Sequence, residues 1–480
     1  MRLIVENRFA LLALVMVALA ALFGVAALTA PAADRAASEP SGVVATVESA
    51  VRACPAPRGG DGARSAIAAF APAGGGSEAG ALAAAENGAA GTAVGDPGTA
   101  GNPWRADTDG DRHTVLRAGG AAAAGLEVVQ TTVGDADGDA FATELRCPEP
   151  SVSTWFAAPG GAELDDLRLF LANVDDSAAT VNVDIYATDG PAFSEDTRGV
   201  TVPAHDEIEL PLNELVEATE AVAVHVRTSS GRVAASLFAE RTGTGADWVP
   251  PTTPPAERHV ITGIPAGGGD KRLIAATLGD DPASATVRII TDEGEVTDAV
   301  QRLEIPPAAS STLVVEGPIG DRPATLVVES DQPVVVGAAY QRSGGADTAY
   351  TAATPPLAGP FDGRAVVPAY PSGTTTDLVF GAPGRGGQVV VTPVGADGEP
   401  GTPQEVEIPA EHTVVPDLDL PRSTRALLVD VADGSGPVHA ARLLRQGSGG
   451  GRSTAVQPLR PAPAEVRLPA ASDSLISVVP

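Results

Sequence analysis

One pattern limits the folds open to this chain more than any other. Between Leu167 and Arg241, apolar and polar residues alternate with a period of two, and Asp-Gly, Pro or Ser-Gly groups interrupt the alternation. Neighbouring side chains of a strand point to opposite faces of its sheet, so this spacing is typical of consecutive antiparallel strands with one buried face. The stretch therefore predicts a β-sheet structure. The residues that we expect in its core are Leu169, Leu171, Val181, Val183, Ile185, Val222, Val224 and Val226.

The same arrangement recurs downstream. One strand reads LFLANVDD from Leu169, LIAATLGDD from Leu273 and LVFGAPGR from Leu378, so the copies lie about 105 residues apart. A fainter copy of a later strand of this unit ends at Cys147. Each unit holds about seven short strands in about 100 residues, which is typical of an immunoglobulin-like sandwich. We predict an all-β protein of tandem immunoglobulin-like β-sandwich repeats; the alternative is a β-propeller in which each unit supplies two blades.

The N-terminal region predicts a membrane anchor. Residues 9–30 carry no charge and are long enough as a helix to cross roughly 30 Å of hydrocarbon. Arg2 and Arg8 precede this segment and favour a cytoplasmic N-terminus. We predict one transmembrane signal-anchor helix, with the bulk of the chain outside the cytoplasm. The alternative is a signal peptide cleaved at Ala30-Pro31-Ala32, which would release a secreted protein.

The chain has two cysteines, Cys54 and Cys147, and each begins a Cys-Pro-X-Pro tetrapeptide. In an oxidising compartment such a pair predicts one disulfide. Closing a loop of this length would stabilise the fold by about 4 kcal/mol. Two cysteines this far apart, with no paired histidines nearby, do not predict a zinc site.

These features divide the chain into eight expected segments. They are a cytoplasmic N-terminus at 1–8, the anchor at 9–30, a linker at 31–48, a degenerate disulfide-closed β domain at 49–152, three β-sandwich repeats at 153–257, 258–362 and 363–463, and a tail with a strand at 464–480.

The charge and the motifs exclude several kinds of function. A formal net charge of −30 disfavours nucleic acid as a partner. The stretches 107–111 and 135–139 resemble calcium loops, but neither has the glycine and glutamate that complete one, and Asp-Gly clusters are also ordinary turns. No nucleophile elbow is present. We predict no catalytic, cofactor-binding or metal-binding residues.

Histidines and tryptophans receive structural interpretations. None of the six histidines forms an HxH or HxxxH pair; His205 and His412 fall at similar points of their units and are interpreted as surface turn residues. Trp104, Trp155 and Trp248 are interpreted as core or interdomain residues, because sugar stacking would need exposed rings.

Several of these features together resemble a known family. They are the anchor, Cys54-Pro55, Cys147-Pro148 followed by Trp155-Phe156, and the strand with Leu167, Leu169, Leu171 and Asn173. This set is similar to an uncharacterised actinobacterial family of membrane-anchored extracytoplasmic proteins, a domain of unknown function. The resemblance implies a role in the cell envelope and supplies no catalytic residues.

We therefore expect a non-enzymatic, membrane-anchored scaffold or interaction protein of the cell envelope. Its expected partners are envelope proteins or polysaccharide, and the cytoplasmic membrane through residues 9–30. The alternatives are a polysaccharide-binding module that assists glycan assembly and a hydrolase without a recognisable motif. Co-purified partners or an acidic cleft would separate these hypotheses.

Overall fold

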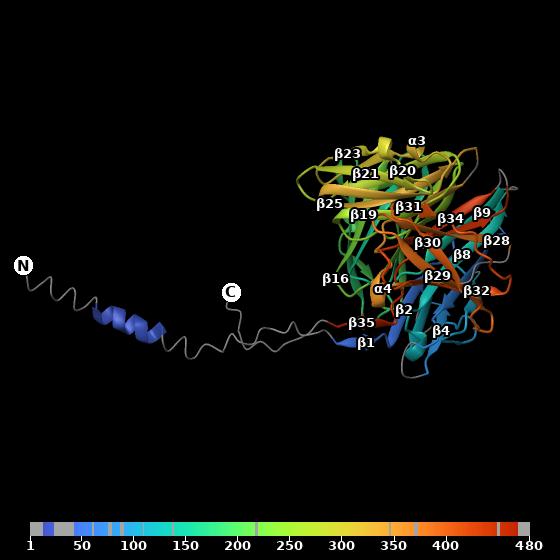
Figure 1. Cartoon of the computed structure of the whole chain (residues 1–480), viewed down its shortest axis with the longest axis horizontal. Coiled ribbons are helices and arrows are strands. Elements are labelled where there is room, and N and C mark those ends of the chain that lie inside the picture. Colours follow the sequence, from blue (N-terminus) through green and yellow to red (C-terminus); the bar gives the residue numbers. More distant parts are fainter. Residues whose placement is uncertain are drawn as a thin grey trace, which may run out of the picture. The chain divides into compact units, whose positions relative to one another are not determined.

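The computed structural model is built almost entirely of β-strands, which confirms the all-β prediction (Figure 1). It describes residues 13–23 and 43–468, except 60–61, 75–78, 87–90, 109, 137–138, 217–218, 345–346, 369–372 and 449–451. Contacts divide the chain into a smaller unit, residues 1–45 with 467–480, and a larger unit, residues 46–466.

In the smaller unit, residues 13–23 are helical. The rest of the predicted anchor over 9–30, and most of the predicted linker and tail, lie outside the described residues. Of the helices that the structure describes, none is both long and apolar enough to span a membrane. Two short strands, β1 (Val44–Thr46) and β35 (Glu465–Arg467), lie at the limits of the two units.

The larger unit contains four β-sandwiches in chain order. The first comprises β2 (Ser49–Cys54), β3 (Arg64–Phe70), β4 (Ala81–Glu86), β5 (Gly98–Thr99), β6 (Trp104–Thr108), β7 (Thr114–Gly119), η2 (Gly120–Ala122), β8 (Glu127–Ala136) and β9 (Asp139–Arg146). The second comprises β10 (Ser153–Pro159), β11 (Leu164–Ala172), β12 (Ala179–Ala187), β13 (Gly190–Ala192), η3 (Glu195–Thr197), β14 (Val200–Val202), β15 (Glu207–Pro211), α2 (Asn213–Val216), β16 (Ala221–Ser230), β17 (Ala234–Arg241) and β18 (Gly245–Val249).

The third and fourth sandwiches follow the same plan. The third comprises β19 (Ala256–Ile264), β20 (Gly269–Thr277), β21 (Ala283–Thr291), β22 (Gly294–Glu295), η4 (Thr297–Ala299), β23 (Gln301–Ile305), β24 (Ser310–Val314), α3 (Glu316–Ile319), β25 (Ala324–Arg342) and β26 (Thr348–Ala352). The fourth comprises α4 (Gly359–Asp362), β27 (Arg364–Pro368), β28 (Thr374–Ala382), β29 (Gly387–Gly395), β30 (Gln404–Ile408), β31 (His412–Val414), β32 (Thr424–Val431), β33 (His439–Gln446) and β34 (Ser453–Pro458).

Each sandwich interleaves strands that are distant in sequence. In the second, β16 lies between β10 and β12 in one sheet, and β11 lies between β15 and β17 in the other. The fourth repeats this order, with β32 between β27 and β29 and β28 between β31 and β33. In the third, β25 is long enough to serve both sheets: one half pairs with β19 and β21, the other with β20 and β26. A propeller blade consists of consecutive strands, so the propeller alternative does not describe this fold.

One turn recurs in the last three sandwiches. Among the described residues, His205, Ala308 and Glu411 are the non-glycine residues with positive φ, at 56°, 47° and 56°. Each lies two residues after the first proline of a matching hairpin, at Pro203, Pro306 and Pro409. The structure thus equates His205 with Glu411. The expectation that His205 and His412 hold similar points is off by one residue, because His412 begins β31.

The alternating pattern correctly identifies the core of the second sandwich. All eight residues that we expected there are at most 2% exposed and form one cluster between its two sheets. Corresponding clusters fill the third, fourth and first sandwiches. Burying side chains between facing sheets is the main source of stability in a fold of this kind.

The last strands of the sandwiches are buried on both faces. In β34 all six residues from Ser453 to Pro458 are buried, and the same is true of His439–Leu444 in β33 and of all of β26. A strand that faces its own core on one side and water on the other would alternate. These strands therefore pack against something beyond their own sandwich.

The second face of these strands packs against a neighbouring sandwich, and the fourth sandwich packs against the first. Strand β9 contacts β18, β18 contacts β26, and β26 contacts β34. Strand β34 lies beside β9, so the fourth sandwich returns to the first (Figure 1). An apolar cluster fills each of the four junctions. In order these clusters contain Leu145, Phe170, Phe238 and Trp248; Trp155, Ala223, Ala276 and Val335; Tyr340, Ala349, Val379, Ala441, Leu443 and Val456; and Phe70, Val366, Val394, Ala426 and Ala462. The four sandwiches form a closed ring, which tandem repetition alone does not predict.

Charged side chains are buried where these inner strands meet. Arg442 of β33 lies 3.2 Å from Glu144 of β9, and both side chains are at most 1% exposed. Asp247 of β18 accepts hydrogen bonds from the backbone N–H groups of Glu144 and Trp248 at 3.3 and 2.8 Å. Burial raises the pKa of Glu144, against the effect of Arg442, and raises the pKa of Asp247 well above its usual value. Polar groups of this kind fix the register between neighbouring sandwiches, because a shifted register would leave them without partners.

The predicted disulfide between Cys54 and Cys147 is present. Cys54 ends β2 in one sheet of the first sandwich, and Cys147 follows β9 in the other sheet. Both residues are fully buried. The bond therefore joins the two sheets at the point where the chain leaves for the second sandwich.

Candidate functional site

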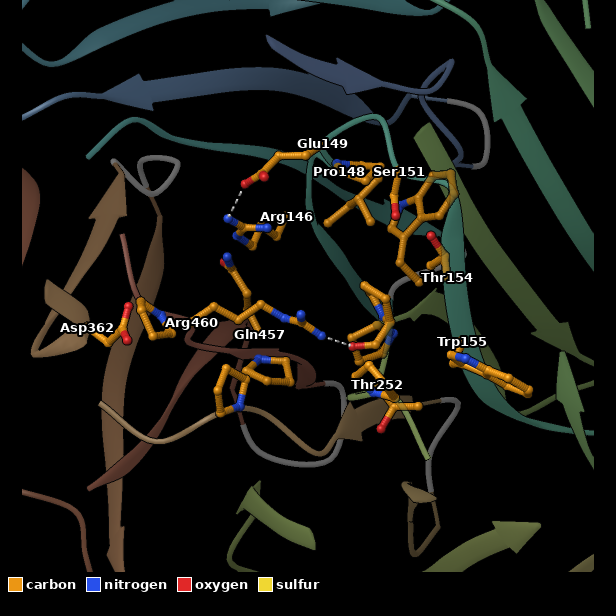
Figure 2. Close-up of a pocket in the computed structure, with 18 of the residues that line it drawn as sticks. Arg146, Pro148, Glu149, Ser151, Thr154, Trp155, Thr252, Asp362, Gln457 and Arg460 are labelled. Atoms are coloured by element: carbon orange, nitrogen blue, oxygen red, sulfur yellow. Dashed lines mark hydrogen bonds and ion pairs between the residues drawn. The ribbon is translucent and has the colours of Figure 1, made fainter. Parts of the chain in front are cut away.

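A cavity of about 660 Å³ lies where the connections between the sandwiches converge (Figure 2). Its walls include residues from the segments that follow β9, β18, β26 and β34, because these four strands meet at the centre of the ring. Nine prolines line it: Pro148, Pro250, Pro251, Pro254, Pro355, Pro356, Pro458, Pro461 and Pro463. Proline fixes φ and has no N–H group, so these walls are stiff and apolar. The cavity is within the range of about 300–1,000 Å³ that is common for small-molecule sites.

Arg460 reaches across this cavity to the carbonyl oxygen of Pro251, to which one of its N–H groups donates (Figure 2). No carboxylate among the described residues forms a salt bridge with Arg460. Burial, and next the neighbouring Arg146, lower the pKa of Arg460 to about 10. Arg460 therefore remains a cation at neutral pH, although no described carboxylate lies within salt-bridge distance of it.

Gln457 is another polar residue of the cavity lining. It lies near the end of β34, three residues before Arg460, and is 5% exposed. Its Oε1 atom is buried and has no hydrogen-bond partner among the described residues. A buried amide oxygen without a donor is unfavourable by about 1–3 kcal/mol. This oxygen is buried from the cavity as well as from solvent, so a molecule in the cavity does not reach it.

Three arginines and two glutamates surround this part of the wall. Arg146 donates to both carboxylate oxygens of Glu127 and lies 3.3 Å from Glu149, while Arg52 lies 2.9 Å from Glu149. Although burial alone would lower it, these glutamates raise the pKa of Arg146. With Arg460 as the third arginine, the cluster has one more positive than negative charge. Asp362 also lines the cavity, and its carboxylate offsets the extra positive charge of this cluster.

The opposite wall contains Trp155, which is unavailable for stacking on a ligand face. Its ring is stacked on His225 with 3.6 Å between ring centroids, and the side chain is 7% exposed. Burial lowers the pKa of His225 to about 4, so the imidazole is neutral at physiological pH. Its Nε2 atom lies 2.9 Å from Ser153 Oγ.

Of the other sequence candidates, Trp248 also lines this cavity, whereas Trp104 does not. Trp104 and Trp248 are buried at 8% and 1% exposure, in agreement with the core interpretation. Of the two calcium-like stretches, Asp109 and Asp137 lie outside the described residues. Within the part of the chain that the structure describes, no group of three His, Cys, Asp or Glu residues is placed to hold a metal ion.

The histidines are dispersed over the four sandwiches. His205 Nε2 lies 2.7 Å from a carboxylate oxygen of Asp176, and His412 contacts the carbonyl oxygen of Ala410. His113, His259 and His439 are buried. None of these five lies beside a nucleophile of the cavity, whereas His225 Nε2 lies 2.9 Å from Oγ of Ser153, which lines the cavity.

Sequence reasoning did not identify Arg460 or Gln457. The signal that was available is the density of prolines in the connections, together with the late strands that are apolar on both faces. The first shows where the chain passes between sandwiches, and the second shows that these strands pack against neighbours. Neither identifies which side chains from four connections share one cavity.

Comparison with known proteins identifies the family. Residues 104–419 match a family of unknown function, DUF5719. The chain belongs to this family. The match confirms a domain of unknown function and provides neither an activity nor a source or location, so the actinobacterial and membrane-anchored character remains a prediction.

No curated protein matches the chain. One similar solved structure is described as "Crystal Structure of Thermotoga maritima 1070"; it is 22% identical, and the match covers 20% of this chain and 91% of that chain, with a TM-score of 0.18. A likeness at that TM-score carries no argument about this protein.

Proposed function

We propose that this member of the DUF5719 family is a non-enzymatic binding protein of the cell envelope, anchored in the membrane by residues 9–30 and exposed outside the cytoplasm. Its four sandwiches would be copies of one immunoglobulin-like module, supported by the shared strand order and the recurring turn at His205, Ala308 and Glu411. The uncharged segment over 9–30 supports the anchor, and the Cys54–Cys147 disulfide supports an oxidising compartment.

The central cavity is the single observation that supports a binding role best. It collects connections from all four sandwiches in a closed ring, so its walls are held from every side. Rigid, pre-formed walls favour recognition because little conformational entropy is lost on binding. Nine of the lining residues are prolines, and proline has no side chain that transfers a proton or attacks an electrophile.

The proposed partners are envelope proteins or polysaccharide, and one observation favours the second. The polar residues Ser151, Ser153, Thr154, Thr252 and Gln457 line the cavity beside the prolines. Sugars present hydroxyl groups around an apolar ring face, which such a mixed lining would accept. A polysaccharide-binding module is therefore the second candidate. The third is a hydrolase, which as a glycosidase would need two carboxylates facing each other across the cavity.

The experiment compares binding with turnover. The full tagged chain is cross-linked in intact cells, extracted in mild detergent and analysed for co-purified protein and for bound wall polymer. Recovery of a defined extracytoplasmic partner or of polymer, together with unchanged polymer length after incubation, is the expected result. Shortening of the polymer would show an enzyme instead. Digestion of the chain by protease added to wall-stripped cells checks the topology, and survival of residues 46–466 would contradict it.

A further inference from the structure

A serine, a histidine and an aspartate lie in sequence of contact beside the central cavity. Ser153 is exposed and lines the cavity. Its Oγ atom lies 2.9 Å from Nε2 of His225. On the other side of the imidazole, Nδ1 lies 3.9 Å from a carboxylate oxygen of Asp184. A nucleophile, a base and a carboxylate in this order are the arrangement that activates serine hydroxyl groups for acyl transfer.

Three neighbouring strands hold these side chains on one face of a sheet. Trp155 of β10, His225 of β16 and Asp184 of β12 lie directly opposite one another in the strand pairing. Ser153 precedes Trp155 by two residues, so both side chains point to the same face. The imidazole is also stacked on the Trp155 ring, with 3.6 Å between the ring centroids. Paired strands and a packed ring therefore keep the serine and the base in place.

The imidazole is in the state that accepts a proton. Burial lowers the pKa of His225 to about 4, so the ring is neutral at pH 7. The carboxylate of Asp184 favours the tautomer with its proton on Nδ1, which leaves Nε2 free to accept from Ser153. A base with a lowered pKa takes up a proton less readily than an ordinary histidine, so the pKa predicts a slow reaction rather than rapid turnover.

Arginines complete the surroundings of the three residues. Arg198 and Arg227 lie 2.5 and 2.7 Å from the carboxylate of Asp184 and hold it beside the ring. Arg227 is also the residue directly opposite Ser153 in the pairing of β10 with β16. When a serine oxygen adds to a carbonyl carbon, the carbonyl oxygen becomes an anion, which the N–H groups of a nearby guanidinium stabilise.

We propose that Ser153 is a nucleophile that accepts an acyl group from an ester ligand of the cavity, with His225 as the base and Asp184 as the residue that positions the imidazole. Ser153 Oγ forms a bond to the ester carbonyl carbon, and His225 Nε2 takes the hydroxyl proton. The ester C–O bond breaks, that proton passes to the departing alcohol, and the acyl group stays on Ser153 as a new ester. This inference goes beyond the proposed binding role, because it makes the cavity a site of covalent capture, which needs no turnover.

The test incubates the full chain in detergent micelles with p-nitrophenyl acetate and, separately, with a fluorophosphonate, whose fluoride leaves when serine oxygen binds phosphorus. Peptide mass spectrometry is expected to find Ser153 modified by at least one reagent. Ser153→Ala is expected to abolish this label. Ser229→Ala is the matched control and is expected to label as the unaltered chain does, because Ser229 is an exposed serine of β16 that donates to the carbonyl oxygen of Thr180. An unmodified Ser153 with both reagents would overturn the proposal.

His225→Phe separates the role of a base from that of a packed ring. Phenylalanine keeps a flat ring against Trp155 and has no atom that accepts a proton, so thermal unfolding is expected to show an intact fold. The rate of labelling at Ser153 is expected to fall by about a hundredfold or more, as the loss of a general base implies. A rate equal to that of the unaltered chain would show that the imidazole does not activate Ser153 and would also overturn the proposal.

Asp184→Asn tests the positioning of the imidazole. With isotope-labelled histidine, the nitrogen resonances of the ring report which nitrogen carries the proton. The unaltered chain is expected to carry it on Nδ1, and Asp184→Asn is expected to move it partly to Nε2 and to lower the labelling rate about tenfold or more. An unchanged tautomer and an unchanged rate would remove Asp184 from the proposal.

The release of p-nitrophenol separates this inference from the proposed function. Release that stops near one equivalent per chain supports covalent capture by a binding protein. Continued release that Ser153→Ala abolishes supports Ser153 as the nucleophile and overturns the non-enzymatic function. An unlabelled Ser153 leaves the envelope-binding function standing if cross-linking still recovers a partner, so the two failures are distinguishable.

Discussion

The carboxylate of Glu144 in the first sandwich lies 3.2 Å from the guanidinium of Arg442 in the fourth, and both side chains are buried at the centre of the ring. Strand β9 supplies the glutamate and β33 supplies the arginine, so this ion pair joins the beginning of the ring to its end. Thr131 also donates to Glu144, at 3.4 Å. The two side chains can meet only if the fourth sandwich packs against the first, so the ion pair forms only in the closed ring.

Arg442→Met is expected to destabilise the chain by about 3–5 kcal/mol, because it leaves Glu144 buried opposite an apolar side chain. Glu144 can take up a proton at low pH, so the loss should be larger at pH 8 than at pH 5. Glu144→Gln should be milder, since burial already raises the pKa of this carboxyl. Urea unfolding at both pH values measures these differences. Equal losses for the two variants, independent of pH, would contradict a closed ring with this pair at its centre.

Asp247→Asn is expected to stabilise the chain at pH 7 by about 1–3 kcal/mol. Burial raises the pKa of Asp247 in the folded chain above its value in the unfolded chain. Below the unfolded pKa the side chain is protonated in both states and costs no stability. As pH rises from there toward the folded pKa, the folded chain loses stability. Asparagine keeps an oxygen for the N–H groups of Glu144 and Trp248 and does not ionise. The gain should therefore shrink as pH falls from 7 to 4. Thermal unfolding across this range checks it, and a gain that grows toward low pH would count against the buried acid.

Loss of the Cys54–Cys147 bond is expected to destabilise the first sandwich by about 4 kcal/mol. The two cysteines are 93 residues apart, and without the bond the unfolded chain between them gains conformational entropy. The double variant Cys54→Ser with Cys147→Ser avoids a lone thiol. Proteolysis that begins within residues 49–146 is the readout. Cleavage that starts instead in the fourth sandwich would show that the bond does not limit unfolding of the first.

Gly337→Ala tests the junction between the second and third sandwiches. A Cβ atom on Gly337 of β25 would lie 2.9 Å from the Cβ atom of Ala157 of β10 and 3.1 Å from its carbonyl oxygen. These contacts are too short, so the two sandwiches must separate or the strands must shift, at about 1–3 kcal/mol. Gly279→Ala is the matched control, because nothing lies within 4 Å of its Cβ position. Equal melting temperatures for the two variants would show that this junction does not pack as described.

Much of each sandwich could be predicted from local patterns. The alternation around Leu169 and Val183 identifies the buried face of each strand, because a strand directs alternate side chains to opposite sides. The prediction of the disulfide required only the two cysteines and the expectation of an oxidising compartment. The turn at His205 was placed within one residue of its counterpart in the fourth sandwich. These features depend on a few neighbouring residues, or on a pairing with a single solution.

The ring and its cavity could not be predicted in the same way. Alternation says that a face is buried but not what covers it, and in β33 and β34 a second face is covered by another sandwich. Whether Ala157 can approach Gly337, or Glu144 can meet Arg442, depends on the relative orientation of whole sandwiches. The chain's own sequence determined the strands, the repeats and the disulfide, because short-range periodicity and composition specify them. Only the tertiary structure decided the closure of the ring and the surroundings of Arg460, because these arise from contacts between surfaces that are remote along the chain.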